Sequence, residues 1–252
     1  MTALEGRVAL VTGSSRGIGA AIASQFARHG AAVAVHGRDK DAVASGVAAI
    51  RDSGGAAAAV IGDVTSYPDV EAIRRQVEDS LGPVDILVAN AGANLTPPAL
   101  LEDIPEDGWR ATVDANLLAT FLTLKSFLPG MKARGRGSII TMASAAGRRA
   151  NARAPIAYGA AKAGVIMLTQ DVAAQAGPAG VRVNCIAPET ILTEGNQERI
   201  PAAVQAELAE FHPLKRLGTP DDVADAAVFL ASDAADWITG LVLDVAGGAV
   251  LA

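Results

Sequence analysis

Short apolar runs alternate with longer segments of helical periodicity along almost the whole chain. The apolar runs are continuous and do not alternate with polar residues, which is typical of strands buried on both faces in a parallel sheet. Seven such strands are expected, at residues 7–13, 31–37, 56–64, 84–92, 137–144, 181–188 and 241–248. The pattern therefore predicts a parallel sheet with helices on both faces.

The segments between these strands predict the helices. They are expected from about Ile18 to His29, over 39–52, over 68–82, from near Glu106 to a stop by Pro129, and around Tyr158 up to Gly177-Pro178. Repeated strand–helix units with short connections give a doubly wound (Rossmann) α/β fold. Because no linker, repeat or low-complexity tract interrupts the pattern, residues 1–252 are expected to form a single domain.

Two segments, 92–105 and 189–200, lack a regular pattern. Each follows a strand, so each is expected at the carboxyl edge of the sheet, where open α/β sheets bind their ligands. We expect substrate specificity to lie in the loops 93–105 and 189–212. Their sequences do not name a substrate.

Composition and charge exclude several classes of protein. Half of the residues are apolar but only 4% are aromatic, so the core must consist mainly of small side chains. With 21 basic and 27 acidic residues the net charge is −6, and the absence of a long basic run argues against nucleic-acid binding. The apolar runs are too short and interrupted to span a bilayer, so no membrane association is expected.

The cysteine and histidine content bears on the cellular compartment and on metal binding. Cys185 is the only cysteine, so no internal disulfide can form, and the simplest expectation is a reducing, cytoplasmic compartment. The amino terminus shows no charged leader with a cleavage site. The histidines, His29, His36 and His212, are scattered and do not have metal-ligand spacing, so no metal is expected.

The stretch VTGSSRGIGAAIA joins the first expected strand to the first helix. Its glycines, Gly13, Gly17 and Gly19, allow the backbone to approach a pyrophosphate, and the helix amino terminus offers free N–H groups. By itself such a turn is equally compatible with a plain tight turn. Its place after the first strand of a strand–helix–strand unit favours dinucleotide binding.

The end of the second strand bears on the choice of dinucleotide. The sequence there reads His36-Gly37-Arg38, and the first carboxylate is that of Asp39. An acidic side chain at this point would bind the ribose hydroxyls, whereas a basic one accommodates a 2′-phosphate. Arg16 in the first turn adds a second guanidinium. Both arginines could be ordinary surface residues, but together they predict NADP(H) over NAD(H).

Tyr158 and Lys162 lie four residues apart, on one face of the expected helix. Such a pair is usually a half-buried ring beside a solvated charge. It can also transfer protons, because an adjacent ammonium favours the phenolate and a reduced carbonyl needs a proton. Ser144 lies upstream, and its hydroxyl could donate to the developing oxyanion.

At this point the chain resembles the short-chain dehydrogenase/reductase family over its whole length, and most closely its 3-oxoacyl-[acyl-carrier-protein] reductase-like branch. The resemblance rests on the order and spacing of modest motifs. They are TGSSRGIG, Asp63-Val64, ANAG at 89–92, Asn116 in DANLLATF, Ser144 in MASAAG, YGAAK, and ITGLVLDVAGG near the carboxyl end.

The resemblance implies a role for each matching residue. Tyr158 would be the catalytic acid and base, Lys162 its activator, Ser144 the hydroxyl that orients substrate and Asn116 a relay residue. The implied cofactor-binding residues are Gly13, Ser15, Arg16, Gly17, Ile18, Gly19, Arg38, Asp63, Val64, Asn90, Ala91, Gly92, Tyr158, Lys162, Pro188, Ile191 and Thr193. A homotetramer is implied as well.

The chain departs from the family pattern in two places near the expected substrate site. Glu189 stands where the family generally has glycine, and it adds bulk and negative charge there unless it points away. A carboxylate in this position would repel acidic substrates and could attract a cationic or hydroxyl-rich one. The loop between Ser144 and Tyr158 is one residue longer than usual, and its segment 147–157 is expected to bulge near the substrate mouth.

Docking of an acyl carrier protein is a separate question. Arg134 lies about where one docking residue would fall, the other expected position near 177–180 is alanine or proline, and Arg148 with Arg149 could substitute. The leading hypothesis is an NADP(H)-dependent oxidoreductase that interconverts a small-molecule ketone and a secondary alcohol. The alternatives are a 3-oxoacyl-[acyl-carrier-protein] reductase and, from a different class, a non-catalytic dinucleotide-binding sensor.

Overall fold

The structure is a computed structural model that describes residues 2–150 and 154–250. Its seven strands form one sheet in the order β3-β2-β1-β4-β5-β6-β7, and every neighbouring pair is parallel. The strands are β1 (Val8–Val11), β2 (Ala32–Gly37), β3 (Ala56–Ile61), β4 (Ile86–Ala89), β5 (Gly137–Met142), β6 (Val181–Pro188) and β7 (Val242–Val245). The expected seven-stranded parallel sheet is therefore confirmed.

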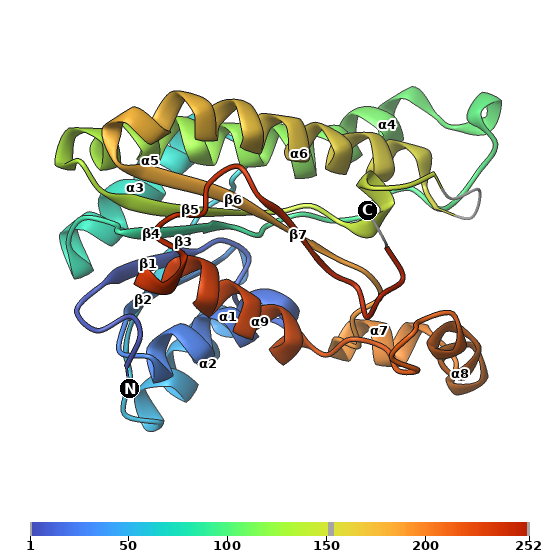
Figure 1. The fold of residues 1–252 in the computed structure, drawn as a ribbon, viewed down its shortest axis with the longest axis horizontal. Helices are drawn as coiled ribbons and strands as arrows, with labels where there is room; N and C mark the ends of the chain where they lie inside the picture. The colour runs from blue at the N-terminus through green and yellow to red at the C-terminus, as the bar shows by residue number, and fades with distance from the viewer. Residues whose placement is uncertain (1, 151–153, 251–252) are drawn as a thin grey trace.

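Helices cover both faces of this sheet, which confirms the doubly wound arrangement (Figure 1). One face carries α1 (Gly17–Arg28), α2 (Lys40–Asp52) and α9 (Pro220–Ala231). The other carries α3 (Tyr67–Leu81), α5 (Ala119–Arg134) and α6 (Ile156–Ala176). None of the helices in the described ranges combines the length and the apolar character needed to cross a bilayer.

Strand β1 shows why the apolar runs are continuous. Ala9 and Val11 pack into the core beneath α1, α2 and α9, whereas Leu10, between them, packs into the core beneath α3, α5 and α6. All three side chains are fully buried. Because successive side chains of a strand point to opposite faces, a strand covered on both sides must be apolar at every position.

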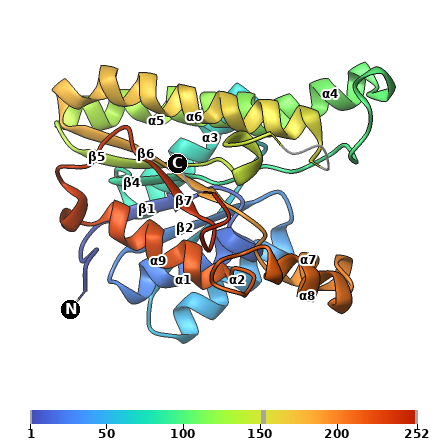
Figure 2. The ribbon, with the colours of Figure 1, turned by 45° about the vertical axis from the view of Figure 1, so that its right-hand side comes forward.

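The order of the strands fixes where a ligand can bind. β1 lies between β2 and β4, so the chain leaves β1 toward one edge of the sheet and later returns toward the other. A crevice forms at such a reversal, outside the carboxyl ends of the strands. At this end of the molecule, α4 (Glu106–Val113) lies on one side of the sheet and α7 (Glu194–Arg199) with α8 (Ala202–Glu210) on the other (Figures 1 and 2).

The helix expected between Glu106 and Pro129 differs from the prediction. α4 is followed by a π-helical turn, Asp114–Leu118, and then by α5, which continues past Pro129 to Arg134. A proline inside a helix removes one backbone hydrogen bond and clashes with the preceding turn, which favours a kink and costs about 3 kcal/mol. Burial of Met131 beyond the proline favours continuing the helix, which ends at Gly135 in a left-handed conformation.

The segment 189–200 also differs from the prediction, because part of it is helical. Thr193 caps α7 by accepting a hydrogen bond from the Asn196 backbone N–H, and α8 follows directly after Pro201. These helices are short and are only weakly buried, so their sequences carry no strong periodic pattern. In 92–105, by contrast, the described regular structure is a single 3₁₀ turn, Leu101–Asp103.

Candidate functional site

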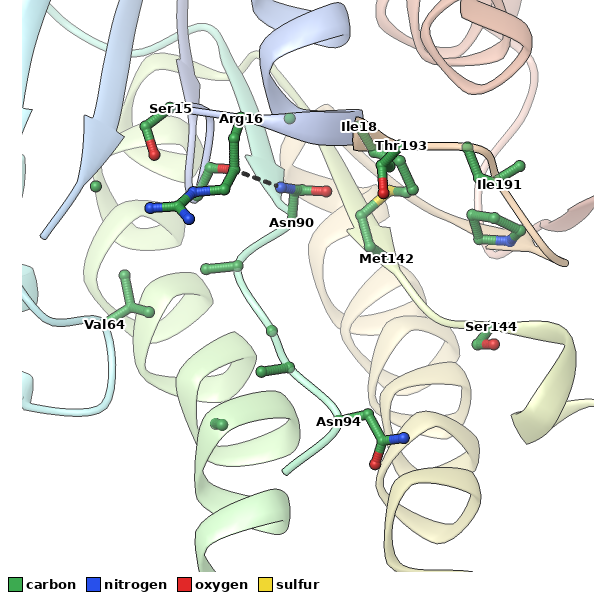
Figure 3. A pocket seen from close by; sticks show the side chains of 18 of the residues that line it. Ser15, Arg16, Ile18, Val64, Asn90, Asn94, Met142, Ser144, Ile191 and Thr193 are labelled. Carbon is green, nitrogen blue, oxygen red and sulfur yellow. Dashed lines mark hydrogen bonds between the residues drawn. The ribbon is translucent and has the colours of Figure 1, made fainter. Parts of the chain in front are cut away.

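A cleft of about 940 Å³ lies at the carboxyl ends of the central strands (Figure 3). It brings together nearly all residues expected at the site. The expected residues that line it are Gly13, Ser15, Arg16, Ile18, Gly19, Arg38, Asp63, Val64, Asn90, Ala91, Gly92, Ser144, Tyr158, Lys162, Pro188, Glu189, Ile191 and Thr193. The other two, Gly17 and Asn116, lie just behind this lining.

The turn between β1 and α1 forms one end of the cleft. Gly13 and Gly17 have φ angles of +64° and +58°, which side chains rarely adopt. A Cβ at Gly19 would lie 2.4 Å from the Gly13 carbonyl oxygen, so only glycine allows the turn to close this tightly. No side chain caps the start of α1, and its first N–H groups are therefore free to meet an anion in the cleft.

His36 holds this turn against β2. The Gly13 backbone N–H donates to His36 Nδ1 over 3.0 Å, and Nε2 lies 3.2 Å from the Gly62 carbonyl oxygen. One ring nitrogen accepts and the other donates, which is the pattern of a neutral imidazole. Burial lowers the pKa of His36 from 6.5 to about 4, in agreement with that form. No motif around His36 predicts this role.

Asn90 and Thr12 hold the same turn from the side of β4. The Asn90 side-chain amide donates to the carbonyl oxygen of Thr12 at 2.9 Å. It also donates to the carbonyl oxygen of Gly13 at 3.2 Å, the bond drawn in Figure 3. The Thr12 hydroxyl accepts from the backbone N–H groups of Asn90 and Ala91. The amide nitrogen of Asn90 is therefore committed to the turn, and Thr12 is a residue of the site that was not predicted from the sequence.

The two arginines expected at the 2′-phosphate lie at the edge of the cleft. Arg16 Nη2 is 3.9 Å from Asp39 Oδ2, and Arg38 Nη1 is 3.6 Å from Asp63 Oδ2. Their side chains are 75% and 80% exposed, so these are loose surface pairs that a phosphate can displace. The other oxygen of Asp39 accepts from two backbone N–H groups of α2 and is turned toward that helix.

Ser144, Tyr158 and Lys162 meet at the other end of the cleft. Ser144 follows β5, and its hydroxyl accepts a hydrogen bond from the Ala146 backbone N–H and lies close enough to Tyr158 to affect the pKa of the phenol. Lys162 is 4% exposed, and its Nζ donates to the Met142 carbonyl oxygen over 2.7 Å and lies 5.5 Å from the centre of the Tyr158 ring. The helix α6 therefore presents the phenol and the ammonium to the same end of the cleft, as their spacing predicts.

The pKa values at this end do not follow the expectation of an activated phenolate. Burial raises the pKa of Tyr158, and the nearby Ser144 hydroxyl only partly opposes that effect. Burial also lowers the pKa of Lys162 from 10.5 to about 8. The phenol of Tyr158 is therefore held in its neutral, protonated form, and Lys162 loses its proton more readily than an exposed lysine does.

Asn116 lies in the π-helical turn, behind Gly92. Its amide nitrogen donates to the carbonyl oxygens of Ala93 and Thr112, whereas its buried Oδ1 has no partner among the described residues. A Cβ at Gly92 would lie 2.6 Å from this oxygen and 3.3 Å from Lys162 Nζ. Asn116 Oδ1 and Lys162 therefore face the same point, which a glycine keeps free of side-chain atoms.

Glu189 is held at the wall of the cleft by a buried histidine. Its Oε2 lies 3.2 Å from Nε2 of His212 and also accepts a hydrogen bond from the Thr190 backbone N–H. His212 comes from the segment after α8, and no pattern in the sequence links it to Glu189. One oxygen of the Glu189 carboxylate is therefore engaged within the protein.

Two of the three arginines considered for docking a carrier protein, Arg134 and Arg148, are turned to other partners, whereas Arg149 is exposed. Arg134 donates to the Val84 carbonyl oxygen inside the fold. Arg148 forms a two-pronged, half-buried ion pair with Asp244 on β7, with hydrogen bonds of 2.9–3.2 Å. Because of these contacts, the side chains of Arg134 and Arg148 are not free to bind a carrier protein.

Three further residues line the cleft from α7 and its end, within the segment 189–212 expected to carry substrate specificity, although none of them was predicted individually. They are Asn196, Arg199 and Ile200. The loop 147–157, expected to bulge near the substrate mouth, includes residues 151–153, which lie outside the described ranges. Among the residues that are described, no cluster of potential metal ligands occurs.

Comparison with known proteins agrees with this arrangement. The family model described as Enoyl-(Acyl carrier protein) reductase matches residues 13–250. The chain is 41% identical over 245 residues to the 3-oxoacyl-[acyl-carrier-protein] reductase FabG of Vibrio cholerae serotype O1, with 97% of this chain and 98% of that protein covered.

Two solved structures extend the comparison. A 7α-hydroxysteroid dehydrogenase complexed with NADH and 7-oxo glycochenodeoxycholic acid superposes with a TM-score of 0.93 at 36% identity, covering 98% of this chain and 95% of that one. A gluconate 5-dehydrogenase from Burkholderia cenocepacia in complex with NADP and tartrate gives a TM-score of 0.91 at 36% identity, covering 98% and 96%. The chain belongs to the short-chain dehydrogenase/reductase family of oxidoreductases that act on hydroxyl and keto groups.

Proposed function

We propose that the protein is an NADP(H)-dependent oxidoreductase that reduces a small-molecule ketone to a secondary alcohol, or catalyses the reverse reaction. The observation that carries the proposal is that Ser144, Tyr158 and Lys162 meet in one cleft with the glycine-rich turn after β1. A dinucleotide-binding turn and a proton-donating phenol in one cleft are the two components that this reaction needs.

The residues present fit a nicotinamide dinucleotide. The uncapped start of α1 and the glycine turn suit its pyrophosphate, and Val64 and Asp63 lie where an adenine pocket is expected. Pro188, Ile191 and Thr193 would lie near the nicotinamide. When bound, this cofactor supplies or accepts the hydride.

The side chains at the other end of the cleft would handle the proton. In the direction of reduction, the Tyr158 hydroxyl gives its proton to the oxygen of the forming alcohol, and the Ser144 hydroxyl donates a hydrogen bond to the same oxygen. Lys162, with its pKa lowered to about 8, can then return a proton to Tyr158. We propose that a water between Lys162 and Asn116 Oδ1 continues this path, because Gly92 leaves that point free.

The proposed preference for NADP(H) rests on the residues that follow β1 and β2. Gly37 ends β2 and offers no carboxylate to the ribose, and Asp39 is turned to the start of α2. The exposed guanidiniums of Arg16 and Arg38 suit a 2′-phosphate. One solved relative is described with NADH and another with NADP, so these local residues carry this part of the proposal.

A role as a 3-oxoacyl-[acyl-carrier-protein] reductase is the second candidate, favoured by the identity to FabG. The internal contacts of Arg134 and Arg148 count against carrier-protein docking, so a general ketone is the better candidate substrate. A non-catalytic sensor is disfavoured, because it would not need the paired Ser144 and Tyr158 beside Lys162.

A spectrophotometric screen tests the proposal. The purified protein is incubated with NADPH or NADH and a panel of β-ketoesters, cyclic ketones, ketoses and 3-oxoacyl thioesters. We expect turnover with at least one ketone and kcat/KM at least about tenfold higher with NADPH than with NADH. Cofactor binding without any turnover favours the sensor, a tenfold preference for NADH refutes the cofactor assignment, and turnover confined to carrier-linked thioesters supports the second candidate.

A homotetramer and a cytoplasmic location stay predictions from the sequence. Exposed apolar side chains support self-association: Phe121 on α5 and Met167 on α6 are 43% and 56% exposed, and Trp237 is fully exposed. β7 also ends the sheet, with an edge that could pair or pack with another subunit. Analytical ultracentrifugation should give four times the chain mass.

A further inference from the structure

The segment after β6 contains an ion pair that the reaction outlined above does not use. Glu189 directly follows β6 and lines the cleft, and His212 lies 23 residues further along the chain. The His212 side chain is 5% exposed and the Glu189 side chain 22%. A buried histidine therefore holds a carboxylate whose surface is still partly open to the cleft.

Both nitrogens of the His212 ring face oxygen acceptors. Nδ1 lies 2.9 Å from the Leu208 carbonyl oxygen, and Nε2 lies 3.2 Å from Glu189 Oε2. A carbonyl oxygen and a carboxylate can only accept a hydrogen bond, so the ring bridges two acceptors. At His36, by contrast, Nδ1 accepts a hydrogen bond. The contact with His212 Nε2 fixes the orientation of the Glu189 carboxylate.

The two carboxylate oxygens of Glu189 differ in their hydrogen bonds. The bonds within the described part of the chain, from His212 and from the Thr190 backbone N–H, both go to Oε2. Oε1 receives no hydrogen bond from the described residues. A fixed carboxylate at the wall of a cleft with one oxygen unused is a hydrogen-bond acceptor for a donor on a bound molecule.

The sheet register places this acceptor beside the reaction centre. Met142 of β5 pairs with Ile186 of β6, so Ser144 and Pro188 are the corresponding residues two positions further on. Neighbouring strands lie about 4.8 Å apart. Glu189 follows Pro188 directly, so its backbone lies one residue beyond the position beside Ser144. Glu189 therefore lines the same cleft as Ser144 and Tyr158, from the end of the neighbouring strand.

The segment that carries His212 is fixed at several points. The Leu214 backbone N–H donates to the Gly247 carbonyl oxygen, and Leu192 and Gly218 are linked by a hydrogen bond of 2.8 Å. A Cβ at Gly247 would lie 3.3 Å from the His212 ring, so the ring packs closely against that backbone. His212 can thus hold Glu189 in one orientation without contacting the substrate itself.

We propose that Glu189 is a specificity-determining residue, positioned by His212, whose free carboxylate oxygen accepts a hydrogen bond from a hydroxyl group next to the carbonyl of the substrate. The substrates it selects are hydroxyketones and the corresponding diols or polyols. The inference rests on the proposed function and adds the substrate class to it. It also gives Glu189 a role in substrate selection other than the repulsion of acids.

The test compares cyclohexanone with 2-hydroxycyclohexanone, using NADPH as the reductant. For the wild-type protein we expect kcat/KM to be at least about tenfold higher for the hydroxyketone, mainly through a lower KM, as one oriented hydrogen bond would provide. Glu189→Leu should bring the ratio to about one by raising KM for the hydroxyketone. Glu189→Gln, which keeps an acceptor oxygen, should retain part of the preference.

His212→Phe tests the positioning role. It should raise KM for 2-hydroxycyclohexanone and leave KM for cyclohexanone unchanged, a split that general loss of structure would not produce. Glu210→Gln is the matched control, because Glu210 forms an exposed ion pair with Lys215 in the same segment. That control should leave both substrates unaffected.

Three results would overturn the inference. They are equal kcat/KM values for the two ketones in the wild-type protein, an unchanged ratio in Glu189→Leu, and an unchanged ratio in Glu189→Gln should the leucine variant fail to fold. Turnover without a hydroxyl preference refutes this inference alone. Absence of turnover with every ketone and both cofactors refutes the proposed function, and the inference with it.

Discussion

The two ends of the cleft are built in different ways, and each contains a buried histidine that shows the difference. At the turn after β1, His36 is neutral and accepts a hydrogen bond from the Gly13 backbone N–H. After β6, the two ring nitrogens of His212 lie beside the Leu208 carbonyl oxygen and the Glu189 carboxylate. The first end uses backbone groups of adjacent strands, whereas the second joins side chains from distant segments.

Because the two ends are built differently, we expect them to bind different parts of the reacting system: the cofactor at the first end and the substrate at the second. The turn after β1 is shaped by glycines and backbone N–H groups, which suit a pyrophosphate whatever the rest of the ligand is. The end near Glu189 is shaped by two side chains whose identities can change without changing the fold. We therefore expect changes at the first end to affect cofactor binding for all substrates, and changes at the second to affect the choice of substrate.

The largest expected effect outside the reaction centre comes from Gly19→Ala. The new methyl group would meet the Gly13 carbonyl oxygen at 2.4 Å and the Asn90 amide nitrogen at 2.6 Å. We expect unfolding free energy to fall by about 1–3 kcal/mol and NADPH affinity to fall at least about 100-fold, because the turn must open. Gly177→Ala is the control, since nothing lies within 4 Å of its added methyl. Urea titration and fluorescence binding measure both quantities, and unchanged affinity in Gly19→Ala would contradict the tight turn.

His36 should make the first end sensitive to acid. Burial lowers the pKa of His36 from 6.5 to about 4, so between these pH values the unfolded chain binds a proton that the folded chain does not. The pKa difference of His36 therefore does not change the free energy of unfolding above pH 6.5. As the pH falls to 4, it lowers the free energy of unfolding by about 3 kcal/mol.

His36→Asn checks this origin of the acid sensitivity. Asparagine keeps an acceptor near the position of Nδ1 but does not titrate. Urea unfolding at pH 7 and pH 4.5 should show a smaller acid loss in this variant than in the wild-type protein. His29→Asn, at the far end of α1, is the control. Equal acid losses in the wild-type protein and His36→Asn would show that the sensitivity arises elsewhere.

The smallest of these effects is expected at the exposed corner of the cofactor site. Arg38→Ala should raise KM for NADPH about tenfold and leave KM for NADH nearly unchanged, because only the phosphorylated cofactor uses the guanidinium. Arg28→Ala, on the surface at the end of α1, should change neither value. A parallel rise in KM for both cofactors would place Arg38 outside the 2′-phosphate site.

Much of the fold and the cofactor end could be predicted from the sequence, because local patterns determine them. Continuous apolar runs require burial on both faces of a strand, and Gly13, Gly17 and Gly19 meet needs of the backbone that only glycine satisfies. The four-residue spacing of Tyr158 and Lys162 likewise predicts that both side chains lie on one face of α6, because residues four apart are neighbours on a helix surface.

The remaining features depend on contacts between distant residues. The pairing of Glu189 with His212, of Arg148 with Asp244 and of His36 with the first turn has no local pattern. The continuation of α5 past Pro129 depends on packing against the sheet, which outweighs a local preference. The raised pKa of Tyr158 follows from burial, a property of the assembled cleft.

The most direct test of the account compares the wild-type protein with Tyr158→Phe, which lacks only the phenolic hydroxyl. NADPH oxidation with the best ketone of the screen gives kcat, and quenching of NADPH fluorescence gives the dissociation constant. We predict that kcat falls at least about 1,000-fold while the dissociation constant stays within about twofold, because the hydroxyl donates the proton without holding the cofactor. A variant that keeps more than about a tenth of the wild-type kcat would contradict the assignment of Tyr158 as the proton donor.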